Sequence, residues 1–212
     1  MFGTIFIASS RYNSINLKLG GLLMEKKQTI STKRIVLTAL LAALTIVGSA
    51  IRITIPVDIA GTTSFHLGNI MCALSGILLG PWYGAAAAGI GSAIYDMLNP
   101  LYISEAWITF LTKGAYGLAA GLVAWFGKKP FGYAKATLAT TVGALTYAAL
   151  YLGKTFFYSG MLMKGLTAQA AALTVVTKLP ATTFNAAIAI ICAPFLAVNI
   201  QAALRENHLH LD

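Results

Sequence analysis

The sequence predicts an all-α membrane protein that crosses the bilayer six times, with both ends of the chain on the cytoplasmic side. Composition and the placement of charge lead to this prediction. Hydrophobic residues make up 58% of the 212 residues and charged residues only 10%, which leaves too little polar surface to coat a soluble protein of this size. The apolar residues gather in six runs, and most of the cations lie between or beside these runs.

The six apolar runs define the six predicted helices. They lie at residues 34–53, 67–81, 83–98, 105–126, 136–158 and 170–200. The second and third runs are short for the ~20 residues that a helix needs to cross the hydrocarbon core. The segment Gly80-Pro81-Trp82-Tyr83-Gly84 between them predicts a tight turn, although a single bent span is an alternative. Because we find no internal repeat and no soluble region, residues 24–212 are predicted to form one domain.

The positions of the cations predict the orientation in the membrane. Stretches rich in Lys and Arg beside membrane spans normally stay in the cytoplasm. Six spans place all three basic stretches on one side, with the loops at 54–66, 99–104 and 159–169 outside. The formal charge of +9 is therefore explained by basic residues beside the membrane spans and does not indicate a nucleic-acid partner. Ten of the fifteen cations form these stretches: Arg11, Lys18, Lys26, Lys27, Lys33, Arg34, Lys128, Lys129, Lys135 and Arg205.

Residues 1–23 are predicted to be a non-native or disordered leader. The apolar part at 1–9 is too short for a signal peptide and has no basic region before it. Gly20-Gly21 can be encoded by a purine-rich stretch that resembles a ribosome-binding site, two codons before Met24. We therefore expect Met24 to be the true start, with a disordered cytoplasmic tail as the alternative.

Small residues recur four apart in several predicted helices. Ala39 and Ala43 lie in the first run, and Gly114, Gly117 and Gly121 lie in the fourth. Such stripes let another helix approach closely. The glycines are predicted to pack within the bundle, whereas the stripe in the first helix is as well suited to docking on another subunit.

Three lysines fall inside predicted spans, where each would cost on the order of 3 kcal/mol if it faced lipid. Lys113, Lys154 and Lys178 all fall in the outer half of the bundle, near Asp96 and Glu105. This placement predicts a water-filled pocket that faces outward and binds an anion or a ligand rich in acceptors, because ammonium groups only donate. Snorkelling, or ion pairing with Asp96 or Glu105, is the alternative.

Other polar side chains should lie at the mouth of this pocket. His66 and Asn69 belong to the segment that closes the first outer loop and begins the second helix. Asn185 is a further polar group within the sixth run, five residues after Pro180. These three residues are predicted to contact the ligand together with the lysines.

The sequence offers no motif for catalysis. It contains no phosphate-binding loop of the form G-x-x-x-x-G-K-[ST], so ATP hydrolysis is expected elsewhere. It also has no metal-binding pattern and no carboxylate pair within a span. The two cysteines, Cys72 and Cys192, lie in apolar runs and are expected to pack there without forming a disulfide. We therefore predict neither a cofactor nor a metal, and no enzymatic activity.

Five short segments follow one another in a distinctive order. They are Ala39-Leu40-Leu41-Ala42-Ala43, Phe65-His66-Leu67-Gly68-Asn69, Leu78-Leu79-Gly80-Pro81-Trp82-Tyr83-Gly84, Gly89-Ile90-Gly91-Ser92-Ala93-Ile94-Tyr95-Asp96 and Phe110-Leu111-Thr112-Lys113-Gly114. In this order and spacing they resemble the S components of the energy-coupling factor (ECF) transporters, which import vitamins. The resemblance covers the chain from Met24 onward.

The resemblance implies a division of labour in the bacterial cytoplasmic (inner) membrane. The S component would bind the vitamin from outside, and a separate module of one membrane T component and two ATPases would power release inside. The family's A-x-x-x-A stripe contacts the T component, and Ala39 and Ala43 match it. The resemblance also places the ligand near the outer ends of the last three helices, beneath the first outer loop.

The residues do not single out one vitamin. The sequence is most similar to the hydroxymethylpyrimidine, pyridoxine or riboflavin-type group, whose ligands are neutral or nearly so. Three lysines would instead suit a carboxylate vitamin such as pantothenate or niacin. Two other functions remain as alternatives: a self-sufficient secondary carrier for a small solute, and an intramembrane enzyme.

Overall fold

The computed structural model describes residues 32–57, 61–127 and 132–207 of the chain. The leader expected at 1–23, the candidate start at Met24 and the cations Lys128 and Lys129 lie outside these ranges. The predictions made for these positions stay predictions.

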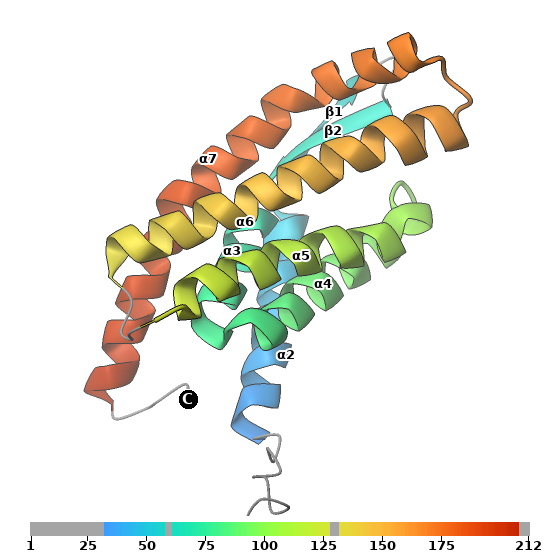
Figure 1. Ribbon diagram of the computed structural model, residues 1–212. Coiled ribbons are helices and arrows are strands. Elements are labelled where there is room, and N and C mark those ends of the chain that lie inside the picture. Colours follow the sequence, from blue (N-terminus) through green and yellow to red (C-terminus); the bar gives the residue numbers. More distant parts are fainter. Residues whose placement is uncertain (1–31, 58–60, 128–131, 208–212) are drawn as a thin grey trace, which may run out of the picture. The chain divides into compact units, whose positions relative to one another are not determined.

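Six α-helices build the described part of the chain (Figure 1). They are α2 (Thr32–Ala50), α3 (Gly68–Leu79), α4 (Pro81–Met97), α5 (Ala106–Trp125), α6 (Tyr133–Lys154) and α7 (Ala168–Glu206). A 3-10 turn, η1 (Ile103–Glu105), leads into α5, and a π-helical segment, η2 (Thr155–Met163), continues α6. The six apolar runs therefore became six helices, and the predicted helical membrane architecture is confirmed.

Three helical stretches are long and apolar enough to cross a membrane by themselves. They are Thr32–Ala50, Tyr133–Met163 and Ala168–Glu206. By contrast, α3 is apolar but has only 12 residues, about 18 Å at the helical rise, against a hydrocarbon core of ~30 Å. It contacts all five other helices, and nearly every one of its residues is buried. Its apolar character thus comes from its place at the centre of the bundle.

Glycines hold α3, α4 and α5 at very close range. A Cβ added to Gly76 would lie 2.3 Å from the carbonyl oxygen of Gly117, and one added to Gly84 would lie 2.4 Å from the Cα of Gly76. The chain reverses between α3 and α4 at Gly80, which has a φ of 84°. The second and third runs are therefore two helices packed face to face, as the tight turn predicted, and the alternative of one bent span is wrong.

The segment between α2 and α3, which the sequence predicted as an outer loop, contains two paired β-strands that the sequence did not predict. Strands β1 (Arg52–Val57) and β2 (Gly61–His66) pair antiparallel. Four of the six residues in Arg52–Val57 are β-branched, namely Ile53, Thr54, Ile55 and Val57, which favours a strand. A loop was predicted at 54–66, but Pro56 lies next to the end of β1 in a two-stranded ribbon, where proline is tolerated. Ile53 and Ile55 are exposed on the hairpin.

An apolar core fills one end of the helical unit. Leu41, Leu78, Ala124, Ala136 and Ala197 belong to one buried cluster. They come from the first half of α2, the end of α3, the end of α5, the start of α6 and the last third of α7. Because starts and ends of helices meet there, the helices run alternately up and down. We call this region the closed end, and the region of the hairpin the open end.

Candidate functional site

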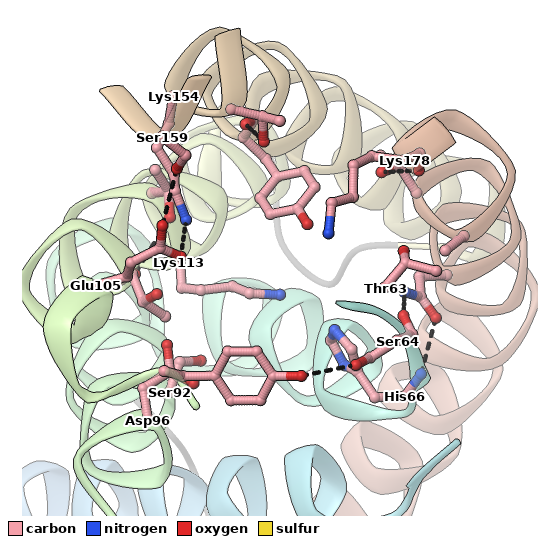
Figure 2. Close-up of a pocket in the computed structure, with 18 of the residues that line it drawn as sticks. Thr63, Ser64, His66, Ser92, Asp96, Glu105, Lys113, Lys154, Ser159 and Lys178 are labelled. Carbon is pink, nitrogen blue, oxygen red and sulfur yellow. Dashed lines mark hydrogen bonds and ion pairs between the residues drawn. The ribbon is translucent and has the colours of Figure 1, made fainter. Parts of the chain in front are cut away.

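A cavity of about 380 Å³ occupies the open end. Its wall is formed by the hairpin, by the connection between α4 and α5, and by the facing sides of α4, α5, α6, η2 and α7 (Figure 2). Of its 26 lining residues, 11 are serine or threonine and only Leu101, Gly160 and Ala181 are non-polar. The volume suits a small organic molecule, and the lining combines hydrogen-bonding groups with the rings of three tyrosines.

Lys113 reaches the cavity from α5 and is held from two directions. Its side chain is only 5% exposed, its Nζ donates to Oδ1 of Asn69, and the ammonium lies 3.9 Å from the ring centroid of Tyr147. The amide oxygen and the aromatic face both stabilise a cation. Because an ammonium has three donors, these contacts orient Lys113 and leave donor capacity for a ligand.

Lys178 reaches the same space from α7. It is 7% exposed, and Figure 2 shows its side chain extending toward that of Lys113 across the cavity. The two residues lie on helices that face each other, so the two ammonium groups bracket the space from opposite sides. Lys113 and Lys178 thus line the same cavity, and their role in ligand binding stays a prediction.

Lys154 forms an ion pair with Glu105. Its Nζ lies 2.5 Å from Oε2 of Glu105, and Ser159 donates to the other carboxylate oxygen at 2.8 Å. Burial alone would raise the pKa of Glu105, but the charge of Lys154 and the hydrogen bonds from Lys154 and Ser159 outweigh it and lower the pKa. The alternative of ion pairing therefore holds for Lys154, which lines the cavity but has its charge balanced.

Asn185 fastens the hairpin to α7. Its Oδ1 accepts a hydrogen bond from the backbone N–H of His66 at 2.9 Å, and its Nδ2 donates to the carbonyl of Ser64 at 2.9 Å. The ring of Phe65 meets that of Phe184 edge to face, with 5.0 Å between centroids. The amide thus pairs with the outer edge of β2 as a neighbouring strand would.

His66 lies in the wall as a neutral imidazole. Burial, reinforced by the positive charges of Lys113 and Arg52, lowers the pKa of His66 well below its usual value. Its Nδ1 accepts the backbone N–H of Gly68 at 3.2 Å. Because a neutral imidazole carries one proton, that proton belongs on Nε2, and His66 serves the cavity as a donor.

Comparison with known proteins decides the family. Residues 29–202 match the model of the family described as "ECF-type riboflavin transporter, S component". The chain belongs to this S-component family. A relative from Pyrococcus woesei, described as an uncharacterized protein in a gap 3′ region, is 32% identical over 118 residues, which cover 56% of this chain and 74% of the relative. Membership makes the chain a substrate-binding subunit of a transporter and not an enzyme.

The fold of this S component brings most of the predicted site residues together. Six of the seven line the cavity: His66, Asp96, Lys113, Lys154, Lys178 and Asn185. The seventh, Asn69, is 1% exposed and lies behind Lys113 as its acceptor. The side chains of Asn69 and Asn185 are thus engaged by the protein itself, so both residues position parts of the site. The assignment of the set to ligand binding stays a prediction.

Sequence reasoning missed Arg52 and the tyrosines of the cavity. The Nε of Arg52 donates to the carbonyl of Ser49 at 2.8 Å, and its guanidinium lies 4.2 Å and 4.9 Å from the ring centroids of Tyr95 and Tyr102. Tyr147 and Tyr151 stack at 5.6 Å on the opposite wall. The sequence places Arg52 at a span boundary, where a cation is common, so nothing in it singled this residue out.

Helical spacing could have identified part of the missing wall. In α7, Thr174, Lys178, Thr182 and Asn185 recur three or four residues apart within an otherwise apolar run, and all four line the cavity. Residues at this spacing share one face of a helix. A polar stripe along an apolar helix therefore indicates that this face of the helix lines a polar cavity.

The stripe of Ala39 and Ala43 lies on the exposed side of α2. Leu40, Leu44 and Val47 are exposed on the same helix, at 54%, 39% and 55%. The glycines of the other stripe pack inside the bundle as predicted, since a Cβ on Gly117 would lie 2.6 Å from the Gly84 carbonyl oxygen.

The two cysteines, Cys72 and Cys192, are both free thiols. Within the described ranges, no group of three or more His, Cys, Asp or Glu side chains could hold a metal ion.

Proposed function

We propose that this S component captures a water-soluble vitamin or vitamin precursor outside the cell and delivers it to an ATP-driven import module. The observation that carries the proposal is the polar cavity at one end of an otherwise apolar bundle. A bundle in lipid gains nothing from 11 serine and threonine residues and five cations around a hollow unless a polar solute fills it. The membrane in question would be the bacterial cytoplasmic membrane.

The charge at the closed end supports an outward-facing cavity. Lys33 and Arg34 begin α2, Lys135 lies in the first turn of α6, and Arg205 lies in the last turn of α7. All four therefore lie at the closed end, and basic residues beside spans favour the cytoplasm. The hairpin and the cavity then face outside, and both ends of the described bundle face the cytoplasm.

The candidate substrates are the vitamins of the group that the sequence resembles. They include hydroxymethylpyrimidine and pyridoxine, riboflavin, for which the matching family is named, and acidic vitamins such as pantothenate. Each is rich in hydrogen-bonding groups. The polar lining can satisfy such groups, since a buried polar group without a partner is costly.

The exposed face of α2 is the proposed docking surface for a T component. Ala39 and Ala43 present small side chains there, with larger apolar residues on either side. Small residues allow close approach between helices in lipid. The T component would in turn join two ATPases, because the phosphate-binding loop for ATP is absent from this sequence.

Co-purification tests this proposal. When the S component is expressed together with the T component and the two ATPases of the same organism, it should purify with all three. The double substitution Ala39→Leu and Ala43→Leu should reduce recovery of the partners at least about tenfold, because each larger side chain blocks close approach. The matched control is the double substitution Ala149→Leu and Ala187→Leu, at positions exposed on α6 and α7. It should leave recovery unchanged.

The secondary carrier is the competing function, and liposomes separate the two. Purified S component alone should show no uptake of the vitamin that it binds, whereas the assembled complex should take it up with ATP. Concentrative uptake by the S component alone would overturn the proposal in favour of the carrier.

A further inference from the structure

The base of the hairpin brings two hydrogen-bond donors of the cavity wall side by side. Arg52 of β1 and His66 of β2 are partners in the strand register, and both line the cavity. Residues directly opposite each other in an antiparallel pair share one face of the ribbon, with Cβ atoms about 5 Å apart. Val57 and Gly61 form the last pair of the ladder, five pairs further along, which is about 17 Å at the usual rise of a strand. The two donors therefore adjoin α2 and α3 at the base of the hairpin.

Arg52 is held by one nitrogen and by two aromatic rings. Its Nε donates to the carbonyl of Ser49 at 2.8 Å, which satisfies an acceptor in the last turn of α2. Its guanidinium lies 4.2 Å and 4.9 Å from the ring centroids of Tyr95 and Tyr102, contacts that stabilise a cation. Among the described residues, Nε is the atom of this side chain that donates a hydrogen bond. The guanidinium is thus oriented by the protein, while its two terminal NH₂ groups can donate to a ligand.

His66 is also held through one ring nitrogen. Its Nδ1 accepts the backbone N–H of Gly68 at 3.2 Å, so the proton of the neutral imidazole belongs on Nε2. The backbone N–H of His66 donates to Oδ1 of Asn185 at 2.9 Å, which fixes the strand that carries the ring. In the part of the chain that the structure describes, Nε2 has no hydrogen-bond partner. Figure 2 shows His66 in the cavity wall, where this N–H serves as a second donor.

The two side chains together select for hydrogen-bond acceptors. The N–H groups of a guanidinium only donate, and so does Nε2–H of an imidazole whose Nδ1 is already engaged. A guanidinium is planar and rigid, and its fork matches two acceptor atoms that lie side by side in one plane. Such acceptors occur as the two oxygens of a carboxylate, as in pantothenate, or as a carbonyl oxygen beside a ring nitrogen, as in riboflavin.

We propose that Arg52 and His66 together form a substrate-binding site at the base of the hairpin, which binds a planar group with two neighbouring acceptor atoms. The inference rests on the proposed function as a substrate-binding subunit and names the part of the substrate that meets the hairpin. The site depends on the fork of Arg52 as well as on its charge, because a lysine ammonium is a compact point charge. A substrate held there is bound to the hairpin itself, so binding also restrains the hairpin.

A conservative substitution of Arg52 tests the site. The purified S component is titrated calorimetrically with riboflavin, pyridoxine, hydroxymethylpyrimidine, pantothenate and nicotinate, and each compound that binds is measured again on the variants. Arg52→Lys keeps the charge and a donor for the Ser49 carbonyl but loses the fork, so affinity should fall about ten- to hundredfold. Arg34→Lys is the matched control, because the guanidinium of Arg34 lies 5.7 Å from the ring centroid of Tyr83 at the closed end. Its affinity should be unchanged.

A substitution of His66 tests whether both donors bind one group. His66→Asn keeps an acceptor for the N–H of Gly68 but is too short to place a donor at Nε2, so affinity should fall about fivefold or more. The double variant Arg52→Lys and His66→Asn should lose less than the product of the two single losses. Side chains that share a partner are not independent, because removing one of them already misplaces the group that both bind.

Two further measurements separate binding from folding. The melting temperature of ligand-free Arg52→Lys in detergent should stay close to that of the unaltered protein, because the hydrogen bond to Ser49 is retained. Hydrogen exchange at residues 52–57 and 61–66 should slow when the ligand is added to the unaltered protein, and it should slow less in Arg52→Lys. The compounds that bind also identify the acceptor group, since pantothenate and nicotinate bring a carboxylate and riboflavin brings a carbonyl beside a ring nitrogen.

Full affinity in Arg52→Lys, or an equal loss in Arg34→Lys, would overturn the inference and leave the proposed function intact. Independent, fully multiplicative losses in the double variant would show that the two residues do not bind one group and would overturn it too. If Arg52→Lys does not fold, the affinity of His66→Asn decides, and full affinity there rejects the site. Binding of none of the five compounds would count against the proposed function as well, which co-purification with the T component tests separately.

Discussion

The closed end and the open end of the bundle are held together by different forces. At the closed end and through the middle, α3, α4 and α5 approach so closely that backbone atoms touch at glycines, and the surrounding side chains are mostly alanine and leucine. At the open end, side chains reach across a hollow and meet through hydrogen bonds and an ion pair. Apolar close packing tolerates almost no change in volume, whereas polar contacts can be exchanged for contacts with a ligand. One end is therefore a scaffold, and the other can adapt.

The largest expected effect tests the scaffold. Gly117→Ala should destabilise the protein by about 3 kcal/mol, because the new Cβ would lie 2.6 Å from the backbone oxygen of Gly84 and overpacking of this kind is costly. Gly114→Ala, one turn earlier in α5, is the control. Its Cβ would meet only the oxygen of Ala85 at 3.5 Å, so stability should change by less than about 1 kcal/mol. Thermal unfolding in detergent measures both, and equal losses would contradict the contrast.

A smaller effect tests the polar contacts of the open end. Asn185→Leu removes both hydrogen bonds between α7 and the hairpin and should cost about 2 kcal/mol. Hydrogen exchange at residues 52–66 should accelerate while exchange in α3 stays slow. Asn199→Leu is the control, because Asn199 is exposed on the same helix and donates only to the carbonyl of Phe195. Unchanged exchange in the hairpin would show that Asn185 does not hold it.

The smallest effect concerns pH and again belongs to the open end. The pKa of His66 is lowered in the folded protein, so below about pH 6.5 the unfolded chain takes up a proton that the folded protein refuses. Stability from this residue is therefore complete above about pH 6.5 and is lost as pH falls toward the folded pKa, by at most about 1.4 kcal/mol per pH unit. His66→Asn keeps an acceptor near Nδ1 and should show a flatter decline in melting temperature between about pH 7.5 and 5.5. Parallel profiles for the two proteins would refute the assignment.

The same comparison separates what the sequence determined from what it could not. Helix number and order followed from apolar runs, because lipid requires each span to satisfy its own backbone. The turn at Gly80 and the interior packing of the α5 glycines followed from residue type. The hairpin did not, because Arg52–Val57 is short, contains a proline and pairs with a strand that contacts Asn185, more than a hundred residues away.

The site divides in the same way. A lysine inside an apolar span is conspicuous by its cost, so Lys113, Lys154 and Lys178 could be selected from the sequence alone. Which of them is balanced by a carboxylate could not, because the contact of Lys154 with Glu105 joins the end of α6 to the start of α5. The sequence by itself determined the helical membrane fold and which charges lie within apolar helices. Only the tertiary structure decided which charges face each other, because that depends on distances between helices that the order of residues does not specify.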